Sequence, residues 1–370
     1  MRRPQSPPAP RADVPKTSAA ERKPALALRF SRALSALGVS PDSPAAIAVS
    51  GGGDSIALMG LFTDWIRCER GVFPAVLIVD HGLRAGSRAE AAMVAGWAEG
   101  EGLAAHVLRW EGAEPKTGIE EKARAARYRL LGDWCATNRL RALLVAHTRD
   151  DQAETFLLRL GRGSGVDGLS AMSARAPFPI PGFESVQLLR PLLDFGRAEL
   201  RVYLTAKDAR WVEDPMNEDV RFARARIRKA LPALEAAGVP ATRIAQAARH
   251  LARAREALDA ATEAFLGAHA RFGGDFAQVD GAALAAAHRE MGLRALSAVL
   301  MRLSGAAYRP RFERLEALFD AIVAGGFMAR TLSGCRVGRA PKARAAFGPR
   351  TLLITRERRR KSAGKPGSKP

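Results

Sequence analysis

The chain has 370 residues, of which 47% are hydrophobic, so it is long enough to form two domains with ordinary cores. Its 58 Lys and Arg exceed its 38 Asp and Glu by 20 charges, which points to a polyanionic partner such as nucleic acid. The sequence shows no apolar run long enough for a membrane span and no secretory signal, and its three cysteines fit neither a disulfide framework nor a CxxC pair. The cytoplasm is therefore the expected compartment.

Apolar stretches of two periodicities alternate along the first half of the chain. After a helix at 25–38, strands are predicted at 45–50, 73–80, 104–110 and 141–147, and helices at 54–67, 87–102, 119–138 and 149–160. This alternation is typical of an α/β fold, in which helices cover both faces of a parallel sheet. Ligands bind such sheets beyond the carboxyl ends of the strands, so we expect functional side chains to follow strands.

The rest of the chain is less regular. Residues 161–195 are rich in Gly and Pro and are interpreted as loop with short elements, followed by a basic helix at 221–238. Helices are then predicted at 242–268, 281–303 and 311–322, and strand-like pieces at 330–339 and 350–357. We interpret 25–238 as an α/β domain, 239–355 as a smaller, mostly helical C-terminal domain, and 1–24 and 356–370 as basic disordered arms.

A Gly-rich segment, Ser50-Gly51-Gly52-Gly53-Asp54-Ser55, follows the first predicted strand and opens a helix. A turn of this kind directs backbone N–H groups and the positive end of the helix dipole at an anion, and glycine lets phosphate oxygens approach the backbone. The segment is neither a Walker A loop nor GxGxxG. Ser50 and Ser55 offer hydroxyls to a pyrophosphate, and Asp54 offers a hard oxygen to Mg²⁺. A generic Gly-rich turn is the competing interpretation.

Six later motifs occur in order: VDHGLR (79–84), EEKARAARY (120–128), AHTRDDQAET (146–155), RGSGVDGL (162–169), RPLL (190–193) and EDPMN (213–217). Together with SGGGDS, this series resembles the tRNA(Ile)-lysidine synthetase family of the PP-loop ATP pyrophosphatases, over about residues 47–232. The resemblance implies a Rossmann-like sheet and a two-step reaction. The wobble cytidine of a CAU anticodon in tRNA(Ile) is adenylated by ATP with release of pyrophosphate, and the amine of free lysine then displaces AMP to give lysidine. It also implies that 239–355 bind tRNA.

Candidate residues suit both steps. Asp54 would hold Mg²⁺ at the triphosphate, and Arg124, which shares a helix face with Tyr128, would neutralise the α-phosphate. Asp151 and Glu154 are three residues apart on one helix face just past a strand, so they could bind the ammonium of lysine and take its proton.

Two histidines are further candidates, and two positions depart from the family pattern. His81 and His147 each follow a predicted strand, and we expect adenine or phosphate contacts from them rather than zinc binding. Thr148 stands where many family members have histidine, and Ala225 where asparagine is usual, so the roles of these two positions are open. The competing functions are a PP-loop tRNA thiolase, which would need reactive cysteines, and a non-catalytic RNA-binding protein.

Overall fold

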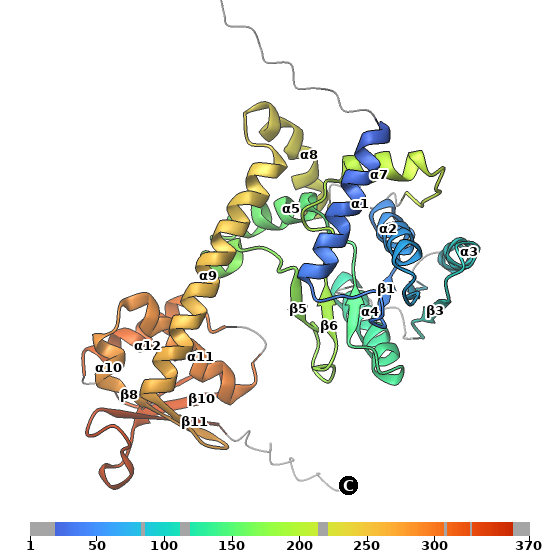
Figure 1. The fold of residues 1–370 in the computed structure, drawn as a ribbon. Helices are drawn as coiled ribbons and strands as arrows, with labels where there is room; N and C mark the ends of the chain where they lie inside the picture. The colour runs from blue at the N-terminus through green and yellow to red at the C-terminus, as the bar shows by residue number, and fades with distance from the viewer. Residues whose placement is uncertain are drawn as a thin grey trace, which may run out of the picture. The chain divides into compact units, whose positions relative to one another are not determined.

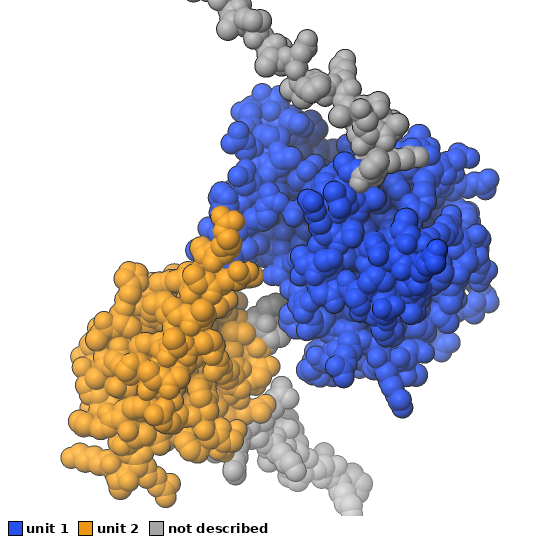
Figure 2. Space-filling view, in the orientation of Figure 1, with its two compact units in different colours: residues 1–252 blue, residues 253–370 orange. Residues whose placement is uncertain are grey.

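The protein is described by a computed structural model over residues 19–82, 86–111, 119–213, 221–306, 309–325 and 328–357. It forms two compact units, residues 1–252 and 253–370 (Figure 2). The division falls inside helix α9 (Ala241–His269), whereas the sequence suggests a boundary after Gly238. Residues 242–266 contain no Gly or Pro, so one uninterrupted helix belongs to both units.

Unit 1 contains a six-stranded sheet, and the predicted α/β fold is confirmed (Figure 1). The strand order is β3-β2-β1-β4-β6-β5, and all neighbours are parallel except β5 and β6. The strands are β1 (Ala46–Ala48), β2 (Ala75–Asp80), β3 (Ala105–Arg109), β4 (Ala142–Leu144), β5 (Arg175–Pro177) and β6 (Gln187–Leu189). The order reverses between β1 and β4, which makes their carboxyl ends the switch point where ligands of such folds bind.

Helices cover both faces of this sheet because alternate strand residues point to opposite sides. Ile47 and Leu144 pack with residues of α1, α2, α3 and α7, whereas Ala46 and Leu143 pack with residues of α4. The helices of unit 1 are α1 (Ala19–Ala36), α2 (Gly53–Glu69), α3 (Ser87–Gly100), α4 (Ile119–Thr137), α5 (Arg149–Leu160), α6 (Val166–Leu169), α7 (Arg197–Ala206) and α8 (Ala223–Ala236).

Three parts of this arrangement differ from the sequence-based expectation. Helix α1 begins at Ala19, inside the segment interpreted as an arm, because Ala, Glu, Arg and Lys favour helix there. Helix α7 was not predicted at all, although Gly196 is its N-cap and the N–H of Gly196 donates to Glu199 Oε1 at 2.6 Å. Strand β11 (Thr351–Arg356) includes Arg356, the first residue of the other predicted arm. Residues 1–18 and 358–370 of the two arms lie outside the described residues.

Unit 2 combines helices with a five-stranded antiparallel sheet of order β7-β8-β11-β10-β9. The strands beside β11 are β7 (Ala270–Phe272), β8 (Phe276–Asp280), β9 (Arg330–Leu332) and β10 (Cys335–Arg339). Helices α10 (Gly281–Ala286), α11 (Arg289–Ser304) and α12 (Phe312–Val323) pack on one face. The predicted single helix at 281–303 is wrong, because Ala287 is extended and His288 caps a new helix. Among the described residues, no helix is long and apolar enough to cross a membrane.

Candidate active site

The Gly-rich segment connects the carboxyl end of β1 to the first turn of α2. Gly51 has φ +86°, and a Cβ there would lie 2.8 Å from Val94 Cγ2, so the position requires glycine. The Ser55 hydroxyl donates to the Gly52 carbonyl at 2.8 Å and accepts from the N–H of Ser50 at 3.2 Å. Ser55 therefore holds the loop closed, while the exposed Ser50 lies at its surface.

A second segment supports this loop from the side. The N–H of Val212 donates to the Gly51 carbonyl at 2.9 Å, and the Arg201 guanidinium stacks 4.6 Å from the centroid of the Trp211 ring. A Cβ on Gly53 would lie 2.8 Å from Arg201 Cζ, so side chain and loop are in close contact. The loop is thereby fixed with the N-terminus of α2 facing the switch point.

Three predicted catalytic carboxylates meet at one guanidinium. Arg197, the first residue of α7, bonds Asp54 Oδ2 at 3.1 Å and Glu154 Oε1 at 2.6 Å, and it also pairs with Asp151 Oδ1. Its own N–H donates to Asp150 Oδ2 at 2.9 Å, which ties α7 to α5. The structure thus brings Asp54 on α2 together with Asp151 and Glu154 on α5.

The first turn of α5 explains the position of Asp151. Thr148 is the N-cap, and its N–H and hydroxyl both donate to Asp151 Oδ2 at 2.8 Å. The N–H of Asp151 lies 3.4 Å from Thr148 Oγ1, which completes a capping box. Threonine at the position where many family members have histidine therefore has a structural function here.

Glu154 is the most deeply buried of the three carboxylates, with a side chain that is 0% exposed. Besides Arg197, Arg228 of α8 bonds its Oε1 at 2.9 Å and its Oε2 at 3.4 Å. Two guanidiniums thus compensate the buried charge, as a buried carboxylate requires. Ala225 is buried on the same helix, so the position where asparagine is usual contributes packing in this chain.

The environments of the acids differ. Burial raises the pKa of Asp54 despite the opposing charge of Arg197. Burial also acts to raise the pKa of Asp151, but Arg197 and the N–H of Thr148 outweigh it, so the pKa of Asp151 is lowered. Asp54 Oδ1 is buried and has no hydrogen-bond partner, which leaves one oxygen of the cluster available to a cation.

A group of arginines lies near His147, which follows β4. Arg124 and Arg127 of α4 stack on Tyr128, with Cζ 5.0 and 5.4 Å from the ring centroid. Arg190, which follows β6, donates to His147 Nδ1 at 3.2 Å and to the Ser173 carbonyl at 2.7 Å. Burial and the neighbouring charge of Arg124 lower the pKa of both Arg127 and Arg190.

Both predicted histidines lie at the carboxyl edge of the sheet. Burial, together with Arg190, Arg224 and Arg127, lowers the pKa of His147 to about 4, so the ring is neutral at pH 7. Burial and Arg127 also lower the pKa of His81, whose Nδ1 is buried without a partner. A neutral imidazole can accept or donate a hydrogen bond to a nucleotide.

Three arginines of this site were not among the predicted site residues. Arg190 belongs to the RPLL motif, to which no role was given, and Arg228 belongs to the basic helix predicted at 221–238, whose arginines were considered only as general contacts to substrate or tRNA. Arg197 lies in a stretch where no helix was predicted. A glycine followed three residues later by Glu199, which receives the N-cap hydrogen bond, was the available signal.

The chain is similar to proteins of known function. Residues 25–234 match the PP-loop domain family. The chain is 44% identical over 274 residues to the tRNA(Ile)-lysidine synthase of Ruegeria pomeroyi, covering 72% of this chain and 62% of that protein. It is 43% identical over 296 residues to the enzyme of the same name from Methylobacterium nodulans, covering 78% and 85%. The chain belongs to the tRNA(Ile)-lysidine synthase family.

The predicted family is thereby confirmed, although the chain spans less than two thirds of the Ruegeria protein's length. Among solved structures, the U34-tRNA thiolase NcsA from Methanococcus maripaludis is similar, with a TM-score of 0.52 at 14% identity, covering 64% of this chain and 79% of that one. This likeness concerns the fold alone. Two of the family motifs are only partly described by the structure. Residues 83–84 of VDHGLR and residues 214–217 of EDPMN lie outside the described part of the chain.

Proposed function

We propose that this protein is an ATP-dependent tRNA(Ile)-lysidine synthase, a cytoplasmic ligase. It would adenylate the wobble cytidine of the CAU anticodon and then join lysine to it, giving lysidine, AMP and pyrophosphate. The names of its relatives support this assignment. The main structural support for the proposal is the cluster of Asp54, Asp151 and Glu154 around Arg197, next to a Gly-rich loop of the kind that binds phosphate.

For the first step, the N–H groups at the start of α2 would bind the triphosphate, and the basic group with Arg124 would neutralise charge that develops on the α-phosphate. Asp54 fits Mg²⁺ through its unpartnered Oδ1. Magnesium bound to nucleotides is commonly held by one or two carboxylates together with substrate phosphates, and Asp54 would be the carboxylate here. Bound Mg²⁺ would supply charge compensation on those phosphates.

For the second step, Asp151 and Glu154 would bind the ammonium of lysine. The lowered pKa of Asp151 keeps it ionised, which suits holding the cation. The pair of carboxylates would also take a proton from that ammonium, which would leave the lysine amine free to attack the adenylated base. Arg197 would keep both carboxylates oriented toward the substrate.

The test is pyrophosphate release that depends on both ATP and a tRNA transcript with a CAU anticodon. Replacing the anticodon by GAU in the same transcript is the matched control, and lysine incorporation into the CAU transcript should require free lysine. Release without any tRNA, or equal release with both transcripts, would contradict the assignment. tRNA binding without pyrophosphate release would indicate the non-catalytic RNA-binding protein.

The thiolase alternative depends on the cysteines. Burial raises the pKa of Cys135 to about 12, and burial also raises the pKa of Cys335, so both thiols are protonated at pH 7. Cys68 is exposed on α2. Replacing all three by serine or alanine should preserve lysidine formation, and a folded but inactive triple variant would favour a thiolase.

A further inference from the structure

Two side chains that follow neighbouring strands meet at the carboxyl edge of the unit 1 sheet. β4 and β6 pair in parallel, and His147 comes shortly after the end of β4, whereas Arg190 directly follows β6. The backbone N–H of Arg190 donates to the Ala174 carbonyl at 2.8 Å, and its guanidinium donates to the Ser173 carbonyl at 2.7 Å. With both ends of the residue held in this way, its Nε–H donates to His147 Nδ1 at 3.2 Å. The contact between arginine and histidine is therefore built into the edge of the sheet.

The hydrogen bond from Arg190 determines which ring nitrogen of His147 carries the proton. A guanidinium has N–H donors and no acceptor, so the nitrogen that faces it must offer a lone pair. Nδ1 of His147 is therefore unprotonated, and the proton of the neutral ring lies on Nε2. A second proton on Nδ1 would place two N–H groups against each other. The hydrogen bond thus selects the Nε2–H tautomer and disfavours the imidazolium.

The charged groups around His147 act mostly in the same direction. Burial disfavours a positive ring, and the charges of Arg190, Arg224 and Arg127 do the same. Asp151 opposes them, yet the pKa of His147 is lowered to about 4. At pH 7 the ring is therefore neutral, and its lone pair is occupied by Arg190. It has the properties of a hydrogen-bond donor and not those of a general acid or a general base.

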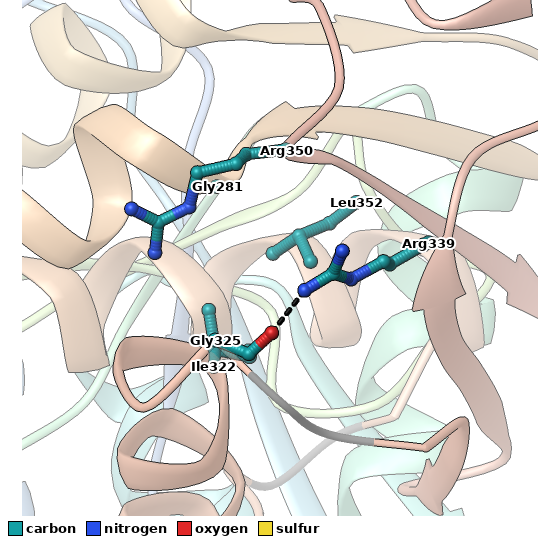
Figure 3. A pocket seen from close by; sticks show the side chains of 6 residues that line it. All are labelled: Gly281, Ile322, Gly325, Arg339, Arg350 and Leu352. Atoms are coloured by element: carbon teal, nitrogen blue, oxygen red, sulfur yellow. Dashed lines mark hydrogen bonds between the residues drawn. The ribbon is translucent and has the colours of Figure 1, made fainter. Parts of the chain in front are cut away.

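Arg190 carries a positive charge that its protein partners do not neutralise. It is 9% exposed, and its side chain reaches the Ser173 carbonyl and a neutral imidazole. In the described part of the chain, no carboxylate pairs with it. Arg339 of unit 2 also donates to a carbonyl, that of Gly325, but Arg339 is exposed and lines a hollow, so water can solvate its charge (Figure 3). A buried guanidinium without such solvation favours an anionic ligand beside it.

The sheet topology places this pair beside the proposed phosphate site. β1 and β4 are parallel neighbours, with Ile47 opposite Leu144, so the Gly-rich loop after β1 and His147 after β4 begin at adjacent points of one edge. Burial and the nearby charge of Arg124, the proposed ligand of the α-phosphate, lower the pKa of Arg190. Among the described residues, none accepts a hydrogen bond from Nε2 of His147. A phosphate oxygen held by the loop would supply that acceptor and compensate the charge of Arg190.

We propose that Arg190 is a positioning residue, which holds His147 as the neutral Nε2–H tautomer so that His147 donates a hydrogen bond to a phosphate oxygen of bound ATP. This inference rests on the proposed function, which supplies the nucleotide. The donor does not change with pH near neutrality, and it stabilises negative charge on the phosphate while the ring transfers no proton. Arg190 acts through the histidine, because it fixes which nitrogen presents the N–H.

The tautomer is measured by nitrogen NMR of the histidine rings, because protonated and unprotonated ring nitrogens have distinct chemical shifts. The chain has six histidines, and the signals that disappear in His147→Gln identify the ring. The wild type should show an unprotonated Nδ1 and a protonated Nε2 at pH 7. Arg190→Met should give a mixture of tautomers and a ring that titrates closer to pH 6.5. Arg129→Met is the matched control, because Arg129 stacks on Phe183 instead, and it should leave the ring unchanged.

Ligand additions distinguish the phosphates of ATP from those of tRNA. ATP with Mg²⁺ should shift the Nε2 signal of the wild type, and a tRNA transcript alone should not. Binding of ATP is then compared between two variants. The amide of His147→Gln reaches the position of Nε2, whereas the amide of His147→Asn ends near the position of Nδ1. The Asn variant should therefore bind ATP about 10-fold more weakly than the Gln variant, since it loses a hydrogen bond to a charged acceptor.

The proposal is overturned by an Nδ1–H tautomer in the wild type, by an Nε2 signal that responds to the transcript and not to ATP, or by equal ATP affinities of the two His147 variants. Thermal unfolding establishes that the variants are folded, and the wild-type spectrum tests the tautomer even if Arg190→Met does not fold. A protein that shows the expected tautomer and response to ATP but releases no pyrophosphate with the CAU transcript would contradict the proposed function and leave this inference standing.

Discussion

Replacing Arg197 by methionine should destabilise unit 1, because it removes the common partner of three carboxylates. Removing one partner of a buried ion pair costs about 3–5 kcal/mol. Arg228 still compensates Glu154, and the side chains of Asp54 and Asp151 are 24% and 13% exposed, so we expect the lower end, about 3 kcal/mol. The melting temperature should fall by about 6–12 °C at pH 7.

The pH dependence separates a charge effect from a packing effect. In the wild type, Arg197 lowers the pKa of Asp151, so this stabilisation is present above the unfolded value of 3.8 and is lost as the pH falls below it. Without Arg197, the pKa of Asp151 should rise from its lowered value, because burial is then opposed only by Thr148 and His147, and its protonation on acidification relieves the repulsion among the carboxylates. The stability gap between wild type and variant should therefore shrink from pH 7 to pH 4.5.

The assay is thermal unfolding over that pH range, with Arg201→Met on the same helix as the matched control. Arg201 pairs with Glu213, which is 77% exposed, and stacks on Trp211, so its removal should cost less than that of Arg197 at pH 7. A gap for Arg197→Met that is constant with pH would refute the electrostatic argument. A gap no larger than that of Arg201→Met would refute the estimate of its size.

Further predictions concern the two steps of the proposed reaction, the titration of His147 and the two basic terminal arms. Asp54→Ala should slow pyrophosphate release by about 10² or more while the fold persists, so near-normal release would remove Asp54 from the magnesium role. Glu154→Gln should raise the lysine concentration needed for lysidine formation, while labelled ATP still forms the adenylated tRNA. An equal loss of both steps would contradict the hypothesis that Glu154 serves the lysine step. Because burial lowers the pKa of His147 to about 4, below its unfolded value of 6.5, stability should fall by about 2–3 kcal/mol from pH 7.5 to 4.5, and His147→Gln should lack this slope. Deleting residues 1–18 and 358–370 should flatten the salt dependence of tRNA binding but preserve CAU preference, whereas an unchanged slope would exclude the arms from tRNA contact.

Periodicity predicts the central part of the fold well because each strand from β1 to β4 is an apolar run followed by a long helix. The same reasoning places Asp54, His147 and Asp151 at one edge of the sheet. It fails at α7, whose ten residues follow a Gly- and Pro-rich loop and bury only one side of the helix. Arg197 was lost with that helix, since its importance depends on where α7 docks against α2 and α5.

In unit 2, the strands were harder to predict for a different reason. β7 has three residues and β8 has five, and both directly adjoin Ala-rich helices, so the helical period dominates any window that contains them. The division between α10 and α11 depends on the extended backbone at Ala287, an alanine whose intrinsic preference is for helix. Packing against the sheet decides that conformation.

The two carboxylate oxygens of Asp151 accept hydrogen bonds from different partners, and this limits which residues can replace it. Oδ2 accepts from the N–H and hydroxyl of Thr148, and Oδ1 accepts from the Arg197 guanidinium, so every neighbour is a donor. An asparagine of the same shape would have to turn its NH₂ toward one of these donors, and a glutamate would move both oxygens away from the helix cap. We therefore expect position 151 to tolerate neither its isostere nor its homologue, because one carboxylate both caps helix α5 and, in the proposed function, binds the substrate.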